Sequence, residues 1–261
     1  MDYLYAVVLG IVQGLTEFLP ISSTAHLILG QRLFGVDPAD FGLSFDAAIH
    51  VGTTAAVIWF FRQDLQTLVR CYCEPAQQRL LIALAIATVP AVVFGLTFEP
   101  YIETSFRELK VIAVTLIVGA FVFILVEYYA KPRKRAEQCT WFDALIIGLA
   151  QSLALVPGVS RSGATIVAGM MLGLDRAAAA RFTFLLSIPI ITGAGLAKLV
   201  EVTQRGSDGR LDLIAVGLVT AMIVGYLTIK YLLRFLAHHR LDVFAYYRLG
   251  VGGIIFLVLL S

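Results

Sequence analysis

The sequence predicts an all-α polytopic membrane protein with about six transmembrane helices, two re-entrant helical hairpins and an inverted-topology repeat. Of the 261 residues, 59% are hydrophobic and 15% are charged, whereas soluble domains average about 45–50% apolar and about 25% charged residues. The mean hydropathy is +0.86. Apolar runs of about 20 residues, such as VIAVTLIVGAFVFILVEYY, match the hydrocarbon thickness of a bilayer when they are helical. The sequence lacks the short alternating strands that a transmembrane barrel requires.

Two segments of the sequence also resemble each other. Residues 10–29 and 148–167 share glycine, glutamine and leucine positions at a separation of 138. After a one-residue gap, Pro20 aligns with Pro157. We therefore expect one integral membrane domain, 1–261, built of two inverted repeats over about 1–130 and 138–261.

The first half begins with two helices that are too short to cross a bilayer. Residues 3–17 precede Pro20 and residues 24–35 follow a run of serines. At about 1.5 Å per residue, neither segment spans a hydrocarbon core of about 30 Å. We expect a re-entrant hairpin with a Pro/Ser turn, followed by three spans near residues 44–61, 80–98 and 109–130.

The second half repeats this order. Short helices are expected near residues 141–155 and 161–173, and spans near 181–200, 211–233 and 243–260. Because each half crosses the membrane three times, the second half enters it in the opposite direction. Inverted repeats whose broken helices meet near the midplane are typical of transporters.

Basic residues indicate the orientation. The predicted topology gathers eleven on one side, namely Arg62, Arg70, Arg79, Lys131, Arg133, Lys134, Arg135, Arg176, Arg181, Arg234 and Arg240. The other side has six, namely Arg32, Arg107, Lys110, Lys198, Arg205 and Arg210. The richer side is expected to be cytoplasmic, with both termini outside. The three cysteines (Cys71, Cys73 and Cys139) then lie near cytoplasmic loops and suggest no disulfide framework.

Each hairpin tip carries hydroxyl groups where its second short helix begins. The first turn of a helix has unpaired N–H groups and the positive end of the dipole, so such a start favours an anion, most often phosphate. An intramembrane charge is costly, by about 2.5–3.5 kcal/mol on insertion scales, and therefore usually marks function. The candidate phosphate ligands are Arg161 and the hydroxyls of Ser22, Ser23, Thr24, Ser160, Ser162 and Thr165.

Glu17 is a second charge at membrane depth. Gln13 lies one turn before it on the same helix face. A buried carboxylate must be protonated, paired or bound to a cation. Glu17 and Gln13 could therefore hold a divalent metal ion through oxygen atoms, or Glu17 could pair with Arg161 and join the two hairpins.

Histidines supply candidate bases. His26 follows Ser23 by three residues, so the two can share a helix face. A neutral imidazole there could take a proton from a serine or a water, or attack phosphorus itself. Asp46 and His50 are one turn apart in the next span, where they either orient the site or bond only to each other.

These motifs resemble one known family. QGLTEFLPISSTAH and PGVSRSGAT are similar to the two signature motifs of the bacterial undecaprenyl-diphosphate phosphatases, the bacitracin-resistance family, and the similarity extends over essentially the whole chain. Gln13 stands where some members have a second glutamate, so the resemblance gives weak support for a two-carboxylate metal site.

The resemblance implies a membrane phosphatase that hydrolyses undecaprenyl diphosphate to the monophosphate carrier used in cell-wall synthesis. It also implies activation by Mg²⁺ or Ca²⁺, a location in the bacterial cytoplasmic (inner) membrane, and an active site open to the periplasmic side. The implied catalytic residues are Glu17, Ser23, His26 and Arg161. The nucleophile is left open among Ser23, His26 and water.

The expected partners are a polyprenyl diphosphate lipid and the membrane, and not nucleic acid; a homodimer is left open. The alternative function is a transporter or flippase of an anionic polyprenyl lipid, because inverted repeats and midplane helix starts also suit alternating access. An intramembrane serine protease fits less well, because an arginine-rich anion site suits phosphate better than a peptide carbonyl.

Overall fold

A computed structural model of the protein describes residues 1–36, 41–70, 74–106, 108–131, 134, 138–205 and 210–260. Within these ranges the protein is helical and contains no β-strand, which confirms the all-α prediction. Of the cysteines and basic residues that indicate the predicted orientation, Cys71, Cys73, Arg107, Arg133 and Arg135 lie outside the described ranges.

The helices follow the predicted order closely. The first half contains α1 (Asp2–Thr16), α2 (Ser23–Phe34), α4 (Leu43–Phe60), α5 (Arg62–Arg70), α6 (Pro75–Ser105) and α7 (Leu109–Tyr129). The second half contains α8 (Trp141–Ser152), the 3₁₀ turn η2 (Leu153–Leu155), α9 (Arg161–Met171), α10 (Arg176–Arg205), α11 (Leu211–Leu236) and α12 (Asp242–Leu260).

The described helices confirm a polytopic membrane protein. Five of them, in α6, α7, α10, α11 and α12, are long and apolar enough to cross a bilayer. A sixth span results if α4 and α5, which meet at a bend of 64°, are counted together. The sequence did not predict α5 as a helix, because its charged residues end the apolar run; only Leu68 of α5 is buried.

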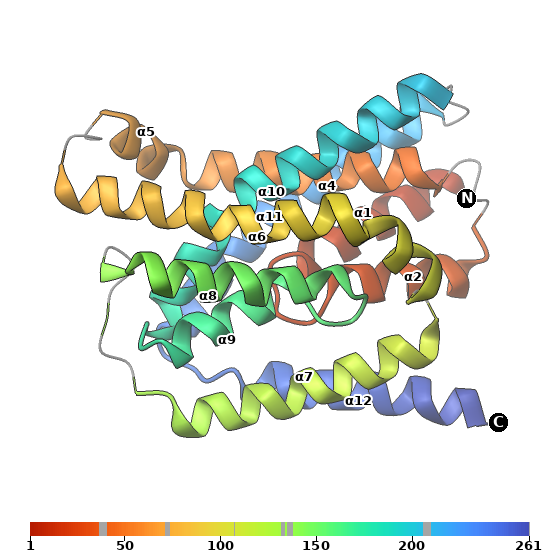
Figure 1. Cartoon of the computed structure of the whole chain (residues 1–261). Helices are drawn as coiled ribbons and strands as arrows, with labels where there is room; N and C mark the ends of the chain where they lie inside the picture. The colour runs from red at the N-terminus through yellow and green to blue at the C-terminus, as the bar shows by residue number, and fades with distance from the viewer. Residues whose placement is uncertain are drawn as a thin grey trace.

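Two hairpins of short helices enter the bundle from opposite ends, and their tips meet in its middle (Figure 1). Helices α1 and α2 form the first hairpin, and α8 and α9 form the second. Helix α1 packs against α11, and α8 packs against α6. Each hairpin is thus held by a long helix from the other half of the chain.

Glycines allow these close contacts. A methyl group at Gly148 of α8 would lie 2.5 Å from the carbonyl oxygen of Ala87 on α6. A methyl group at Gly14 of α1 would lie 2.9 Å from the carbonyl oxygen of Ala221 on α11. Small residues that let helix backbones approach are typical of membrane helix packing.

Both ends of the described chain lie at the same end of the bundle, and α5 lies at the opposite end (Figure 1). This agrees with the predicted placement of the two termini on one side. Cys139 precedes α8, is buried and forms no disulfide. Burial raises the pKa of its thiol to about 12, so the thiol stays protonated at physiological pH.

Candidate active site

The two hairpin tips have the same backbone shape where their second helices begin. Ser22 caps α2 with φ 77° and ψ 101°, and Ser160 caps α9 with φ 73° and ψ 113°. Positive φ is uncommon for a serine and costs energy, so it persists only where the surroundings fix it. The two caps are 138 positions apart. The separation of 138 therefore continues through the tips without the one-residue gap. Gly158, and not Pro157, corresponds to Pro20 there.

The cap geometry uses the serine side chains. The Ser22 hydroxyl accepts a hydrogen bond from the backbone N–H of Ala25, and the Ser160 hydroxyl accepts one from Gly163. Such N-caps satisfy one of the free N–H groups of the first turn. The remaining first-turn N–H groups of both helices are directed back toward the tips.

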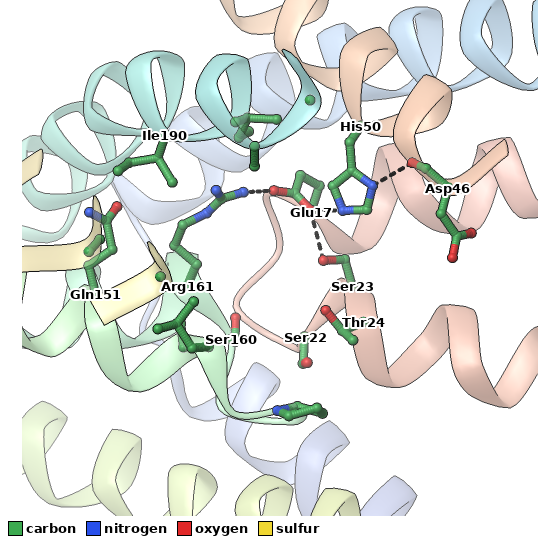
Figure 2. A pocket seen from close by; sticks show the side chains of 18 of the residues that line it. Glu17, Ser22, Ser23, Thr24, Asp46, His50, Gln151, Ser160, Arg161 and Ile190 are labelled. Atoms are coloured by element: carbon green, nitrogen blue, oxygen red, sulfur yellow. Dashed lines mark hydrogen bonds and ion pairs between the residues drawn. The ribbon is translucent and has the colours of Figure 1, made fainter. Parts of the chain in front are cut away.

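A cavity of about 470 Å³ opens beside the tips (Figure 2). Its polar wall comes from the two hairpins and α4, and includes Glu17, Ser22, Ser23, Thr24, Gln31, Asp46, His50, Gln151, Ser160 and Arg161. Its apolar wall comes mainly from α6 and α10, and includes Val92, Gly95, Leu96, Pro189, Ile190 and Gly193. The cavity therefore offers a charged end and an apolar side to one ligand.

Glu17 is the centre of the polar contacts. Its Oε1 atom is paired with the Arg161 guanidinium, which joins the first tip to the second. Its Oε2 atom accepts hydrogen bonds from the Ser23 hydroxyl at 2.7 Å and from the Gln13 amide at 3.0 Å. The same Oε2 atom lies 3.9 Å from the His50 Nε2 atom (Figure 2). The structure thus brings four predicted site residues together and places His50 beside them.

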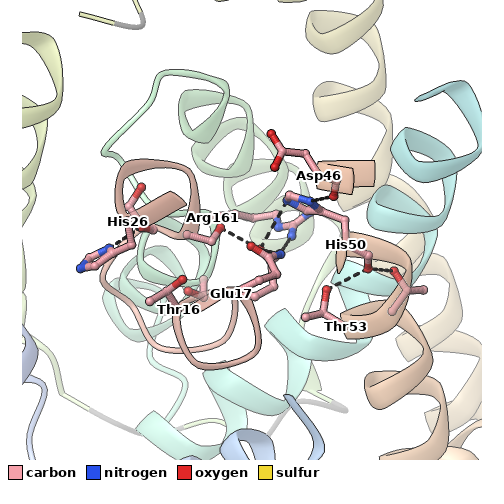
Figure 3. Close-up of polar contacts among 12 residues, drawn as sticks. Thr16, Glu17, His26, Asp46, His50, Thr53 and Arg161 are labelled. Carbon is pink, nitrogen blue, oxygen red and sulfur yellow. Dashed lines mark hydrogen bonds and ion pairs between the residues drawn. The ribbon is translucent and has the colours of Figure 1, made fainter. Parts of the chain in front are cut away.

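His50 presents one free ring nitrogen to this cluster. Its Nδ1 atom lies 2.7 Å from the backbone oxygen of Asp46 (Figure 3). A carbonyl oxygen only accepts hydrogen bonds, so Nδ1 carries the proton. In a neutral ring, Nε2 is then the unprotonated nitrogen, and it faces Glu17. The Asp46 carboxylate accepts a hydrogen bond from Gln31 at 2.9 Å, so Asp46 and His50 bond to more than each other.

His26 does not line the cavity. Its Nδ1 atom donates to the backbone oxygen of Ser22 at 2.7 Å. Its Nε2 atom lies 2.8 Å from the Tyr247 hydroxyl on α12, and the two rings stack. The ring therefore faces α12, on the side of α2 away from Glu17 (Figure 3). The three-residue spacing from Ser23 does not bring both side chains into one site.

Two of the predicted phosphate ligands, Ser162 and Thr165, point into the protein and not into the cavity. The Ser162 hydroxyl donates to the backbone oxygen of Leu19 at 3.1 Å and so links the two tips. The Thr165 hydroxyl donates to the backbone oxygen of Arg161 and accepts from Thr183. Neither residue lines the cavity, whereas Ser22, Thr24 and Ser160 do.

The described residues do not form a complete site for Mg²⁺ or Ca²⁺. Hard divalent ions require about six or more oxygen ligands, and no group of three His, Cys, Asp or Glu residues gathers in the described ranges. Glu17 is already paired with Arg161, and Gln13 turns its amide N–H, not its oxygen, toward Glu17. The Gln13 Oε1 atom is buried without a hydrogen-bond partner, so Glu17 and Gln13 offer a carboxylate and an amide oxygen, and a Mg²⁺ ion there would take its other ligands from water and substrate phosphate.

Sequence comparison places these residues in a known context. The profile of the family described as "Bacitracin resistance protein BacA" matches residues 6–254. A protein of Rubrobacter xylanophilus named "Undecaprenyl-diphosphatase" is 45% identical, and the alignment covers 100% of this chain and 99% of the relative.

Two further relatives carry the same name. The protein of Mycolicibacterium vanbaalenii is 43% identical over 100% of this chain and 98% of its own length. The protein of Thermodesulfovibrio yellowstonii is 42% identical over 99% of this chain and 98% of its own length. Because the profile and the relatives span nearly the whole chain, this protein belongs to the bacitracin resistance protein BacA family.

Proposed function

We propose that this protein is a membrane phosphatase that hydrolyses undecaprenyl diphosphate to undecaprenyl phosphate and inorganic phosphate. One observation carries the proposal: the Ser23 hydroxyl donates to Glu17 within a cavity that also contains Arg161. A hydroxyl bonded to a carboxylate, beside a guanidinium, combines a nucleophile, a base and an anion-binding group. The full-length relatives named for this activity support the same conclusion.

Binding starts with an exchange of partners at Arg161. The guanidinium is paired with Glu17, and a terminal phosphate with two or more charges is a stronger partner for it. Arg161 and the first-turn N–H groups then stabilise the charge on the phosphate oxygens, which supplies most of the catalysis in phosphoryl transfer. Glu17 loses its cation at that moment and becomes a stronger base.

Ser23 is the nucleophile that this arrangement favours. Its oxygen attacks the terminal phosphorus while its proton passes to Glu17 Oε2, at 2.7 Å in the structure. The bond from that phosphorus to the bridging oxygen breaks, and undecaprenyl phosphate leaves with the electron pair. His50, at 3.9 Å from Oε2, is placed to relay the proton onward.

Water completes the cycle. Glu17, with its proton passed on, accepts a proton from a water molecule that attacks the phosphoserine. The bond between phosphorus and the Ser23 oxygen breaks, Glu17 gives the proton taken from water to that oxygen, and inorganic phosphate is released. A direct attack by water would bypass the phosphoserine and give the same products.

The apolar wall of the cavity suits the first isoprene units of the lipid. Pockets of about 300–1,000 Å³ hold ligands of modest size, so a cavity of about 470 Å³ takes the headgroup and the proximal chain, and the rest of the chain lies in lipid. Gly95 on α6 and Gly193 on α10 face open space, because a methyl group on either would meet no atom within 4 Å.

Replacing Gly193 with phenylalanine is expected to raise KM for undecaprenyl diphosphate about tenfold, equivalent to about 1.4 kcal/mol of binding, with little change in kcat. The added ring would fill the space at the apolar wall without touching the tips. Gly253→Phe is the matched control, because Gly253 also faces open space but does not line the cavity. Steady-state kinetics in detergent check the prediction, and equal KM values for the two variants would contradict it.

We propose that a divalent cation binds together with the substrate's diphosphate, and we assign it no catalytic step. Replacing Gln13 with glutamate would add a second carboxylate beside Glu17. More ligand charge tightens cation binding, so this variant is expected to reach half-maximal activity at about tenfold lower Mg²⁺, again about 1.4 kcal/mol. A titration of activity against Mg²⁺ checks it. An unchanged midpoint would show that Gln13 does not neighbour the cation.

We further propose that the protein lies in the bacterial cytoplasmic membrane with this cavity open to the periplasmic side. The cavity residues of α6 and α10 lie toward the ends of these helices that are near both termini. That end carries fewer of the basic residues, which favours the outer side. A cysteine introduced at Tyr3 should react with a membrane-impermeant maleimide in spheroplasts.

Transport of an anionic polyprenyl lipid is the second candidate, favoured by the two hairpins that enter from opposite ends (Figure 1). Purified protein in vesicles with labelled undecaprenyl diphosphate separates the two functions. Phosphate release above protein-free vesicles supports the phosphatase. Transbilayer movement of the lipid without phosphate release would replace it with transport.

A further inference from the structure

Arg248 on α12 is a charged residue with no exposed surface. Its guanidinium carries five N–H donors, and five backbone oxygens accept from it. Nε donates to Leu116 at 3.2 Å, Nη1 to Pro20 at 3.3 Å and Val159 at 3.2 Å, and Nη2 to Thr115 at 3.1 Å and Gly158 at 3.0 Å. Within the described ranges, no carboxylate forms an ion pair with Arg248.

These five oxygens come from three places in the fold. Pro20 belongs to the tip of the first hairpin, while Gly158 and Val159 belong to the tip of the second. Thr115 and Leu116 belong to α7. One side chain therefore bonds both tips at once and ties them to the pair formed by α7 and α12, which lie side by side (Figure 1).

The surroundings are shaped to admit the guanidinium. A methyl group at Gly119 of α7 would lie 2.1 Å from the Arg248 Nη2 atom. The Phe123 ring lies 5.1 Å from the guanidinium carbon, in a cation–π contact. A glycine gap, an aromatic face and five carbonyl oxygens thus make a closed cradle. Removal of any one of these parts would move the charge or leave buried oxygens without donors.

We propose that Arg248 is a positioning residue that fixes the two hairpin tips against each other, and so sets the distance between Ser23 and Arg161. This inference rests on the proposed function. Arg248 does not line the cavity, so it acts through the tips and not on the substrate.

The contacts between the tips explain why such a clamp is needed. Besides Arg248, the tips are joined by the Arg161–Glu17 pair and by the Ser162 hydroxyl on the Leu19 oxygen. The proposed reaction draws Arg161 away from Glu17 toward phosphate. The bonds from Arg248 do not depend on that pair, so they hold the tips in register while the charge partner changes.

Two variants disturb the clamp in different ways. Arg248→Lys keeps the charge but offers three donors in place of five. Gly119→Ala keeps Arg248 but displaces its guanidinium. Because a misplacement of about 1 Å can cost about 10²-fold in rate, we expect kcat to fall about 10- to 100-fold in both variants, with KM within about threefold of wild type.

Two controls match these variants. Gly250→Ala adds a methyl group to α12 where it meets no atom within 4 Å. Arg176→Lys changes an arginine that pairs with Glu127, with the Nε donor at 2.8 Å, at the other end of α7. Both controls are expected to keep kcat within about twofold of wild type, the level of a change remote from the site.

Amide hydrogen exchange distinguishes a positioning role from a purely structural one, because a positioning role changes the exchange rate at the tips and not throughout the protein. In detergent, we expect faster amide exchange in peptides covering both tips of Arg248→Lys and Gly119→Ala, with unchanged exchange in α11. Wild-type kcat in both variants would overturn the proposal. So would a loss of activity that follows the unfolded fraction, with faster exchange throughout the protein. If wild-type protein releases no phosphate, the proposed function fails, but the exchange at the tips still decides the role of Arg248.

Discussion

Replacing Arg161 with alanine is expected to lower kcat/KM for undecaprenyl diphosphate by about 10³-fold, because one charged donor to a transferring phosphoryl group contributes this much or more. The guanidinium contacts Glu17 across the two tips and lines the cavity. Its loss removes the cation for the terminal phosphate and leaves the buried Glu17 carboxylate without its partner. Phosphate release by purified protein in detergent measures the effect.

Arg161→Lys serves as the matched variant. Lysine keeps the charge but lacks the planar fork that binds two oxygens at once. We therefore expect its kcat/KM to lie between those of wild type and Arg161→Ala. The melting temperature of Arg161→Lys should stay close to wild type, because the charge remains and Ser162 and Arg248 also hold the tips. Arg161→Ala leaves the buried Glu17 carboxylate unpaired and should melt at a lower temperature, so its kcat/KM is measured well below that transition. An alanine variant with kcat/KM within about tenfold of wild type would remove Arg161 from the headgroup site.

The helices were predictable because their signals are local. Apolar length defined the spans, and α7, expected over residues 109–130, covers Leu109–Tyr129. The short helices followed from Pro20, the serine run and the thickness of a bilayer. The amphipathic α5 was missed because its sequence resembles a charged loop, and only the bend after α4 gives it a face to bury.

The sequence predicts which site residues lie together only where residues that are close in the sequence are also close in the fold. Glu17 and Ser23 flank one tight turn and were both predicted site residues, and the structure joins them by a hydrogen bond. The pairing of Glu17 with Arg161 was one of two stated alternatives, and it depended on the repeat bringing two tips together.

The histidines could not be assigned in the same way. The direction of His26 is set by Tyr247, which lies 221 positions away in the chain. His50 faces Glu17 because α4 passes the first tip, and no local pattern encodes that crossing. The one-turn spacing marked Asp46 and His50 as a pair that either orients the site or bonds only to each other, and it gave no sign that His50 faces Glu17.

Replacing Ser23 with alanine is the second change with a large expected effect. If Ser23 is the nucleophile, kcat should fall by about 10³-fold or more, the scale seen when a nucleophile is removed and the rest of a site remains. Loss of a hydrogen bond alone would cost about 1 kcal/mol, or less than about tenfold. Ser187→Ala is the control, because that buried hydroxyl bonds the Phe184 backbone oxygen in its own helix and does not line the cavity.

A trapping experiment tells the three nucleophiles apart. Wild-type protein mixed with substrate labelled at the terminal phosphate and quenched in acid should retain label on Ser23, because a phosphoserine survives acid and a phosphohistidine does not. A parallel alkaline quench detects phosphohistidine: label that survives alkali but not acid would indicate His26, and a protein counts as unlabelled only if it carries no label after either quench. An unlabelled protein, together with a Ser23→Ala variant within about tenfold of wild type, would assign the attack to water. Glu17, which accepts the Ser23 proton at 2.7 Å, would then serve as the base for that water.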